Sequence, residues 1–241
     1  MTDLEGVSLA IPFFNEEAVL ATTLDSAWAF LKNLGRPFEL ILADDGSTDS
    51  SPRIAREFLE RHTDGCRMVR NGVNTGRGSV LSKAFAASRM PVAMYIDADL
   101  EIALRFAGDL LAKLDDPAVV VCTGTKLTSE QHGYRAYHRM AASRVFNYLI
   151  RMFLHSHVSD HQCGLKGFRR SVLPGLMSQS QEKGWAWDTE ILLLARKAGY
   201  RVHEVPVELS ATRRSKVAFF KTVVMFAGKL IEFRRRGLVL R

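Results

Sequence analysis

Short apolar runs that end in polar or acidic residues recur along the first half of the chain, and segments with the apolar spacing of helices separate them. Apolar strands that alternate with helices are typical of a mainly parallel sheet with helices on both faces. With 241 residues, 47% of them hydrophobic, the chain can bury one sizeable core. The sequence therefore predicts an α/β domain. The predicted strands of this half are 7–14, 38–45, 66–70, 91–99 and 118–125, and its predicted helices are 16–34, 50–60 and 79–88.

The second half of the chain has a different pattern. Residues 134–155 have the composition of a long helix, and residues 159–170 read as a loop that enters a short strand. A further loop opens a helix that Gly199 can end, because glycine accepts the left-handed backbone common at helix C-termini. A late strand at 200–209 and an amphipathic helix at 216–236 complete the predicted elements.

Charge and cysteine content narrow the class of protein. The net charge of +7 favours an anionic partner, such as nucleic acid, a phosphorylated substrate or anionic lipid. The basic C-terminal stretch lacks the aromatic platform that binds single strands, so we expect no nucleic acid. Three cysteines without a CxxC pair indicate a reducing compartment and no structural zinc. The first residues lack the features of a signal peptide, and no apolar run could span a bilayer, so a cytoplasmic protein is expected.

Polar and acidic residues follow three of the predicted strands, in the stretches "IPFFNEE", "ADDGS" and "DADLE". In open α/β sheets, ligands bind at the carboxyl ends of strands, near the point where the strand order reverses. We therefore expect these three stretches, which are far apart in sequence, to converge on one crevice.

Three acids stand at alternate positions in "MYIDADLEI", namely Asp97, Asp99 and Glu101. Like charges this close repel one another, so a cation is expected among them. Carboxylate oxygens suit Mg²⁺ or Mn²⁺, which typically take one or two carboxylates together with substrate phosphates. Asp99 and Glu101 could supply that pair, while Asp97 could accept a hydrogen bond from a ribose hydroxyl. The alternative is a set of acids that complements a helix N-terminus.

Asp44 and Asp45 stand side by side before Gly46, which lets the chain turn so that both carboxylates can reach a ligand. An ionised carboxylate only accepts hydrogen bonds, so it could read the N–H groups of a nucleotide base. Arg77, between two glycines in "NTGRGS", could approach base or phosphate. The alternatives are an Asp-rich turn and a plain loop before a helix.

Taken together, these stretches resemble a known family. "IPFFNEE", "ADDGSTD", "NTGRGS", "DADLE", "DHQCGLKGFRR" and "WAWDTE" occur in the order found in family 2 glycosyltransferases of the GT-A (nucleotide-diphospho-sugar transferase) fold. The resemblance runs from residue 7 to about 216 and is greatest to polyprenyl-phosphate (dolichyl-phosphate) sugar transferases. The "QCGLKGFRR" and "WAWDTE" stretches favour the glucosyltransferase branch, with the mannosyltransferases second.

The resemblance implies an inverting transfer of a hexose from a nucleotide-diphosphate sugar to a polyprenyl or dolichyl phosphate. UDP-glucose is the favoured donor, GDP-mannose is second, and Mg²⁺ or Mn²⁺ is the expected cofactor. By position, Pro12, Glu16 and Asp44 or Asp45 would hold the nucleoside. Asp97 would contact the ribose and nucleotide, and Asp99 the metal. Glu101 stands where the mannosyltransferases have Gln, a difference that can alter ligand geometry or donor choice.

The acceptor phosphate needs cations near the anomeric carbon of the sugar. Arg139 and Ser143 are four apart on a predicted helix and so share a face, and relatives use an Arg and a Ser at that spacing for this phosphate. Arg213 and Arg214 resemble a later phosphate-binding loop of the family. Gln162 is assigned to an acceptor loop that folds over the donor.

Asp188 matches the position of the acid/base carboxylate in many relatives, so it is predicted to act with Asp99 in catalysis. A lipid phosphate is already ionised near neutral pH, so Asp188 would serve either as a base or only to orient the acceptor and metal site. The alternative is an N-cap of a helix that begins near Thr189. Trp185 and Trp187 would line the sugar or lipid entry, or belong to the core.

The predicted last helix has a wide apolar surface with a basic stripe, and it either packs on the domain or lies in a bilayer interface. We accordingly predict a glycosyltransferase domain over residues 1–215, a C-terminal amphipathic helix within 216–241, and peripheral attachment to the cytoplasmic face of a membrane. Competing functions are a family 2 transferase with a soluble sugar or polysaccharide acceptor, and a non-catalytic nucleotide-binding module. A nucleotidyltransferase is disfavoured because no "GxGTR"-like loop is present.

Overall fold

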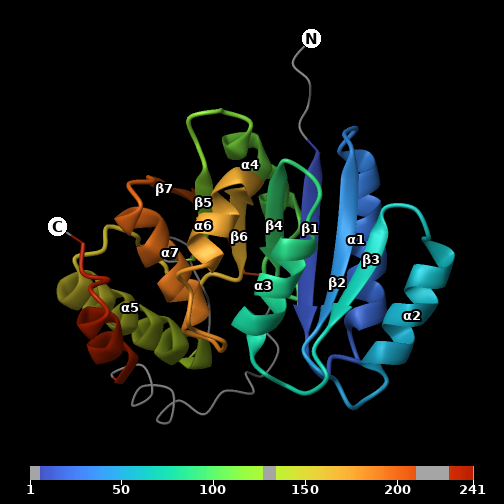
Figure 1. Cartoon of the computed structure of the whole chain (residues 1–241). Coiled ribbons are helices and arrows are strands. Elements are labelled where there is room, and N and C mark those ends of the chain that lie inside the picture. The colour runs from blue at the N-terminus through green and yellow to red at the C-terminus, as the bar shows by residue number, and fades with distance from the viewer. Residues whose placement is uncertain (1–5, 127–133, 210–227, 241) are drawn as a thin grey trace.

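A computed structural model describes residues 6–126, 134–209 and 228–240 of the chain (Figure 1). These residues form one seven-stranded sheet with the strand order β3-β2-β1-β4-β6-β5-β7. The strands are β1 (Val7–Phe13), β2 (Phe38–Asp44), β3 (Cys66–Arg70), β4 (Val92–Ile96), β5 (Val121–Thr125), β6 (Leu165–Arg169) and β7 (Val202–Pro206). The helices are α1 (Leu20–Asn33), α2 (Ser51–Arg61), α3 (Arg77–Ala87), α4 (Arg105–Leu114), α5 (Tyr134–Leu154), α6 (Leu173–Met177) and α7 (Trp187–Lys197), with a 3₁₀ turn at Arg170–Val172.

The sheet is mainly parallel, as the sequence predicted. β1 pairs in parallel with β2 and β4, β2 with β3, and β5 with β7. Only β6 runs antiparallel to its neighbours within this sheet, between β4 and β5. The strand order reverses beside β1, because the chain moves outward to β2 and β3 on one side and returns to β4 on the other.

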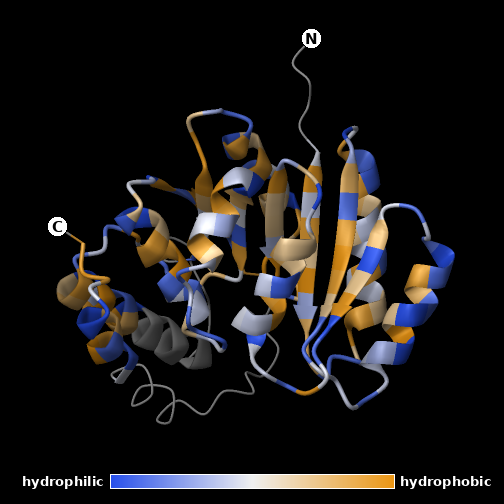
Figure 2. Ribbon diagram, viewed as in Figure 1, coloured by the Kyte–Doolittle hydropathy of each residue, from blue (hydrophilic) through white to orange (hydrophobic). Residues whose placement is uncertain are grey.

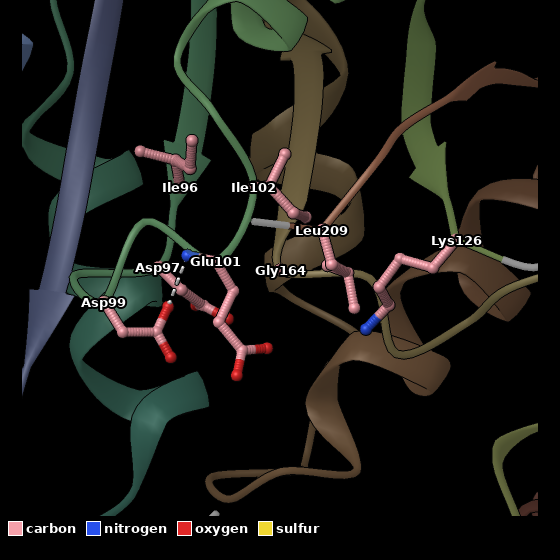
Figure 3. A pocket seen from close by; sticks show the side chains of 8 residues that line it. All are labelled: Ile96, Asp97, Asp99, Glu101, Ile102, Lys126, Gly164 and Leu209. Atoms are coloured by element: carbon pink, nitrogen blue, oxygen red, sulfur yellow. Dashed lines mark hydrogen bonds between the residues drawn. The ribbon is translucent and has the colours of Figure 1, made fainter. Parts of the chain in front are cut away.

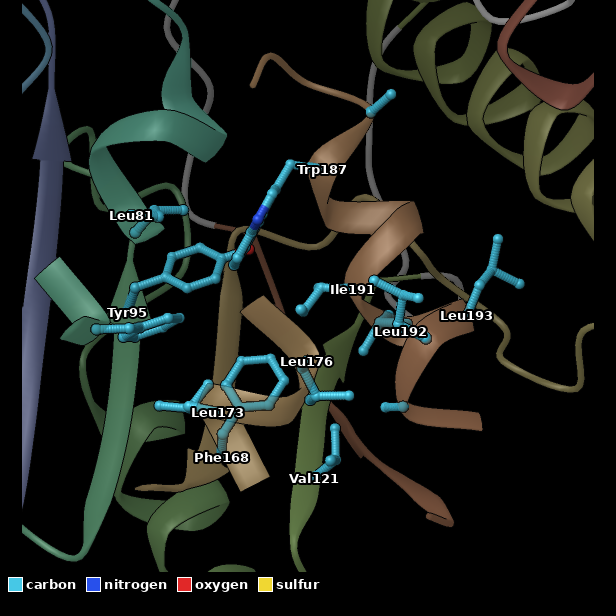
Figure 4. Close-up of a cluster of buried hydrophobic side chains, with 14 of the residues drawn as sticks. Leu81, Tyr95, Val121, Phe168, Leu173, Leu176, Trp187, Ile191, Leu192 and Leu193 are labelled. Carbon is cyan, nitrogen blue, oxygen red and sulfur yellow. The ribbon is translucent and has the colours of Figure 1, made fainter. Parts of the chain in front are cut away.

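Apolar side chains fill two clusters, one on each face of the sheet, because successive strand residues point to opposite faces. One cluster joins strand residues such as Tyr95 and Phe168 to α3, α6 and α7, and Trp187 is fully buried within it (Figure 4). The other joins the alternate strand residues to α1, α2 and α4. Helices therefore cover both faces, and Figure 2 shows hydrophobic residues along the central strands.

Some helix boundaries follow local signals, whereas α1 begins at Leu20, four residues after its predicted start, and α4 was not predicted. Asp49, which precedes the N-cap residue Ser50, accepts a hydrogen bond from the Ser51 backbone N–H (2.9 Å) at the start of α2. Gly199 adopts φ +87° directly after α7 and ends it as predicted. α3 begins two residues before the predicted 79–88 helix, so Arg77 lies on its first turn.

The described C-terminal residues pack on the domain. Residues 228–235 are helical, whereas the start of the predicted 216–236 helix lies outside the described residues. Leu230, Phe233 and Leu238 are buried in the cluster that contains α7. The Leu240 N–H donates to the Leu154 carbonyl (3.0 Å) at the end of α5. None of the helices in the described ranges is long and apolar enough to cross a membrane.

Candidate active site

The loops that follow β1 and β2 are joined at the carboxyl end of the sheet. The Asn15 N–H donates to Ser47 Oγ (3.0 Å), and Asn15 Oδ1 in turn accepts from the Thr48 N–H (2.8 Å). The Glu16 N–H donates to Ser51 Oγ (2.9 Å). β4 lies on the other side of β1, so the residues after β4 meet these loops beside the point where the strand order reverses. The structure thus brings together the three stretches that the sequence placed at one crevice.

A pocket lies at the carboxyl end of β4 (Figure 3). It is lined by Ile96, Asp97, Asp99, Glu101, Ile102, Lys126, Gly164 and Leu209. In Figure 3 the carboxylates of Asp99 and Glu101 lie on the same side of the pocket, and the Lys126 side chain reaches toward them from the opposite side. Asp99 Oδ1 accepts a hydrogen bond from the Glu101 N–H (3.1 Å), which fixes the turn that presents both acids.

The pocket favours a cation. Partial burial raises the pKa of Asp99, and the neighbouring carboxylates of Glu101 and Glu16 raise it further. Within the described ranges, no group of three or more His, Cys, Asp or Glu side chains forms a metal site by itself. Asp99 and Glu101 both line the pocket, and two carboxylates are the partial ligand set that Mg²⁺ or Mn²⁺ takes when phosphates and waters complete its coordination.

Asp97 lies between this pocket and a buried arginine. Its Oδ1 is 2.6 Å from Arg77 Nη2. Burial raises the pKa of Asp97 to about 6; Arg77 opposes this rise, whereas Asp188 adds to it. The backbone of Gly164 passes so close that a Cβ at this position would overlap the Asp97 carboxylate. Any other residue there would have to displace the Asp97 carboxylate, which gives the glycine of the "QCGLKG" stretch a physical role.

Asp44 and Asp45 are both buried and hold the surrounding loops. Asp44 Oδ2 pairs with Arg70 Nε (2.8 Å). Asp45 accepts hydrogen bonds from the N–H groups of Thr75 (3.1 Å) and Gly76 (2.9 Å), and Gly76 has φ +106°. These carboxylates link the "ADDGS" turn to the "NTGRGS" loop, a connection that the sequence did not reveal. Their contact with a nucleoside stays a prediction, as does that of Pro12, which is buried in β1.

Arg77 is enclosed in the site, with its side chain 11% exposed. Its guanidinium lies over the ring of Tyr95 (5.0 Å to the centroid) and over that of Trp185 (5.2 Å). Its Nη1 faces Asp188 Oδ2 at 3.5 Å. Although burial opposes its charge, Asp188 and Asp97 raise the pKa of Arg77, so it stays protonated. Trp187 belongs to the core, whereas Trp185 is half exposed at this site, and its role in lining the sugar or lipid entry stays a prediction.

Asp188 is buried, and each of its two oxygens faces a cation. Oδ1 accepts hydrogen bonds from the Tyr95 hydroxyl and from Lys166 Nζ (3.0 Å). Burial by itself would raise its pKa, but Arg77, Lys166 and the Tyr95 hydroxyl hold the pKa of Asp188 below its usual value. Sequence reasoning missed Lys166 and Tyr95; the only local sign was a lysine inside the apolar run "GLKGF".

The N-cap interpretation of Asp188 is wrong. α7 begins at Trp187 with Ala186 as its N-cap residue, and no side chain caps it. Asp188 therefore lies inside the first turn, where its side chain turns toward Tyr95 and Lys166 instead of the helix N–H groups.

The structure describes only some of the residues predicted to bind the acceptor. Arg139 and Ser143 belong to α5, but their side chains lie outside the described part, and Arg213 and Arg214 lie outside the described residues altogether. Gln162 Nε2 donates to Thr189 Oγ1 (2.7 Å), so the predicted acceptor loop is attached to α7 beside Asp188. Cys163 in this loop is buried.

Comparison with known proteins shows which family the chain resembles. The family model "Glycosyl transferase family 2" matches residues 8–176. Glycosyltransferase AglD of Haloferax volcanii is 32% identical over 229 residues, which cover 93% of this chain and 36% of AglD. The dolichyl-phosphate beta-glucosyltransferase of Dictyostelium discoideum is 26% identical over 245 residues, covering 97% of this chain and 75% of that protein. The chain thus spans about a third of AglD and three quarters of the glucosyltransferase.

Solved structures show the same fold. Glucosyl-3-phosphoglycerate synthase from Mycobacterium tuberculosis, in complex with Mn²⁺, UDP-glucose and phosphoglyceric acid, superimposes with a TM-score of 0.71 at 19% identity, covering 98% of this chain and 81% of that one. At this identity the likeness concerns the fold alone, which is the predicted GT-A fold. Because the family model matches most of its length, the chain belongs to glycosyl transferase family 2.

Proposed function

We propose that this chain is an inverting, metal-dependent hexosyltransferase that moves a sugar from a nucleotide diphosphate to a polyprenyl or dolichyl phosphate. UDP-glucose is the favoured donor and GDP-mannose the second. The resemblance to dolichyl-phosphate beta-glucosyltransferases over nearly the whole chain supports this choice of acceptor and sugar. The Mn²⁺ and UDP-glucose in the M. tuberculosis neighbour support a divalent cation and a uridine nucleotide.

The donor would bind at the carboxyl ends of β1 and β4. Asp99 and Glu101 would hold Mg²⁺ or Mn²⁺, which offsets the negative charge of the departing diphosphate when it is bound. Asp97 lines the same pocket and is 34% exposed, so its carboxylate can accept a hydrogen bond from a ribose hydroxyl. Arg77, held against Asp97, adds a fixed positive charge beside the leaving group.

The observation that carries the choice of acceptor is the environment of Asp188. A sugar hydroxyl must lose a proton as it attacks, so it requires a general base within hydrogen-bond reach. Asp188, for which a base was one of two predicted roles, is 1% exposed and faces Arg77, Lys166 and Tyr95. A phosphate oxygen is already ionised and can attack the anomeric carbon without a base. As the new C–O bond forms on one face, the bond to the diphosphate breaks on the other, which inverts the configuration.

An exposed apolar strip supports attachment to a membrane surface, where a lipid acceptor resides. Val145, Tyr148 and Met152 are exposed on α5 at helical spacing, and Phe153 extends the strip. Ile231 is exposed on the C-terminal helix, which contacts the same end of α5 through the hydrogen bond from Arg234 to the Phe153 carbonyl (3.3 Å). The same two helices also carry the exposed basic residues Arg144, Arg151, Arg234 and Arg235, which would attract anionic headgroups.

A donor panel tests the proposed function. Purified protein receives radiolabelled UDP-glucose, GDP-mannose or another nucleotide sugar with a polyprenyl phosphate and Mg²⁺ or Mn²⁺. We expect organic-extractable label from UDP-glucose, loss of that label with a chelator, and its return with added metal. Asp99→Asn should reduce the label strongly, whereas Asp109→Asn, which changes an exposed acid on α4, should not.

Each competing function gives a different result. Label that stays water-soluble and requires an added sugar would favour a transferase with a soluble acceptor. Metal-dependent donor binding without any turnover would favour a non-catalytic nucleotide-binding module. Absence of organic-extractable label with every donor would refute the proposed lipid-phosphate acceptor.

A further inference from the structure

A lysine is buried in the sheet next to the site. Lys166 of β6 is 0% exposed, and its strand partner in register is Tyr95 of β4, so the two side chains lie on the same face. Its Nζ donates to the Cys163 carbonyl (2.7 Å), to Asp188 Oδ1 (3.0 Å) and to the Tyr95 hydroxyl (3.3 Å). A lysine is almost never fully buried unless its charge is paired, because removing an ammonium from water is costly.

Lys166 is the inner end of a row of alternating charges that reaches the pocket. Asp188 follows it, then Arg77, whose Nη1 is 3.5 Å from Asp188 Oδ2. Arg77 Nη2 is 2.6 Å from Asp97 Oδ1, and Asp97 lines the pocket with Asp99. The row holds two cations and two carboxylates, so its formal charge is zero.

Resting on the function proposed above, we propose that Lys166 is a positioning residue of the donor site. The Lys166 ammonium balances the negative charge of Asp188. Asp188 can therefore hold the Arg77 guanidinium in place without drawing that guanidinium away from Asp97. Lys166 acts through these side chains and does not itself touch the donor. The residue that the family resemblance marks as a base, Asp188, serves in the same row as the support for Arg77.

The consequence of removing Lys166 follows from the charge count. Without its ammonium the row carries one net negative charge in a buried place. Arg77 is then attracted more strongly to Asp188 and less to Asp97. The pocket would face an anionic diphosphate with one additional unit of negative charge, and the donor would bind more weakly.

The test is a rescue by charge balance. We would compare the wild type with Lys166→Met, Asp188→Asn and the double variant, using titration calorimetry with UDP-glucose and Mn²⁺. Lys166→Met should weaken donor binding about tenfold or more, because the loss of one positive charge near a partly screened anion site has an effect of about this size. The double variant is neutral again and should bind at least about threefold more tightly than Lys166→Met.

Glu39→Gln is the matched control. Glu39 is also buried and ion-paired, 2.8 Å from Arg67 Nη2, but it lies near the start of β2, at the opposite end of the sheet. Its neutralisation should lower the melting temperature and leave donor affinity unchanged. If Lys166→Met does not fold, Lys166→Gln, whose amide can still donate to the Cys163 carbonyl, takes its place in the same comparison.

The outcomes separate this inference from the proposed function. Donor affinity in Lys166→Met equal to that of the wild type, or a double variant weaker than both single variants, would overturn the role of Lys166. A wild type that binds UDP-glucose and shows the rescue, yet transfers no label to lipid phosphate, would overturn the proposed acceptor and leave Lys166 as a donor-site residue.

Discussion

The buried imidazole of His161 should make the stability of the fold depend on pH. The ring lies in the predicted acceptor loop and is 0% exposed. Asn147 Oδ1 accepts from the His161 N–H (2.9 Å) and lies 3.2 Å from Nδ1, so Nδ1 carries the proton; Nε2 then accepts from Ser156 Oγ (2.8 Å). The neutral tautomer therefore satisfies both of its partners.

The size of the effect follows from the pKa of His161. Burial, together with the nearby charges of Lys166 and Arg151, lowers it from 6.5 to about 3. Because the unfolded chain binds this proton more readily, stability is complete above pH 6.5 and falls as the pH drops toward 3. The loss approaches about 1.4 kcal/mol per pH unit, which gives about 2 kcal/mol between pH 7 and pH 5.

Urea unfolding of the wild type and of His161→Gln at pH 7, 6 and 5 measures this effect. Other groups also titrate in this range, so the meaningful quantity is the difference between the two proteins, which should shrink by about 2 kcal/mol toward pH 5. His157→Gln, a change of an exposed histidine four residues away, is the matched control for the loss of an imidazole. An equal slope in His161→Gln and the wild type would refute a neutral buried imidazole.

Three further substitutions test other parts of the structure. Gly164→Ala should push the Asp97 carboxylate aside and weaken donor binding at least about tenfold in calorimetry, while the circular dichroism spectrum stays unchanged. Trp187→Ala should lower the free energy of unfolding by about 3 to 5 kcal/mol in urea; a loss below about 1 kcal/mol would contradict its place in the core. Arg236→Met removes the cation 2.5 Å from buried Glu190, so the amides bonded to Glu190 should exchange hydrogen faster, and unchanged exchange would contradict that docking.

Much of the fold could be predicted because it rests on local patterns. Apolar runs of strand length, helical spacing and turn residues are properties of neighbouring residues, so the strands up to β5 and the end of α7 at Gly199 were placed correctly. The rule that ligands bind where parallel strands end extended this local information to the site. It placed Asp97, Asp99 and Glu101 at the edge where the pocket lies.

The partners of buried charges could not be predicted, because they depend on which segments meet. Asp44 could be recognised as an acid at a turn, but its ion pair with Arg70 requires β2 and β3 to lie side by side. Asp188 looked like a helix cap because the residues around it are typical of a helix start. Its position inside the first turn of α7 depends on contacts with β4 and β6.

By itself the sequence determined the kind of sheet, the family, and the acids that crowd the end of β4. Only the tertiary structure decided that β6 is inserted antiparallel between β4 and β5, and this insertion carries Lys166 beside Tyr95. A lysine in an apolar run has no local feature that marks it as buried and paired. The cost of burying its charge is offset only when a carboxylate from a distant helix lies within hydrogen-bond distance. That distance is a property of the folded chain.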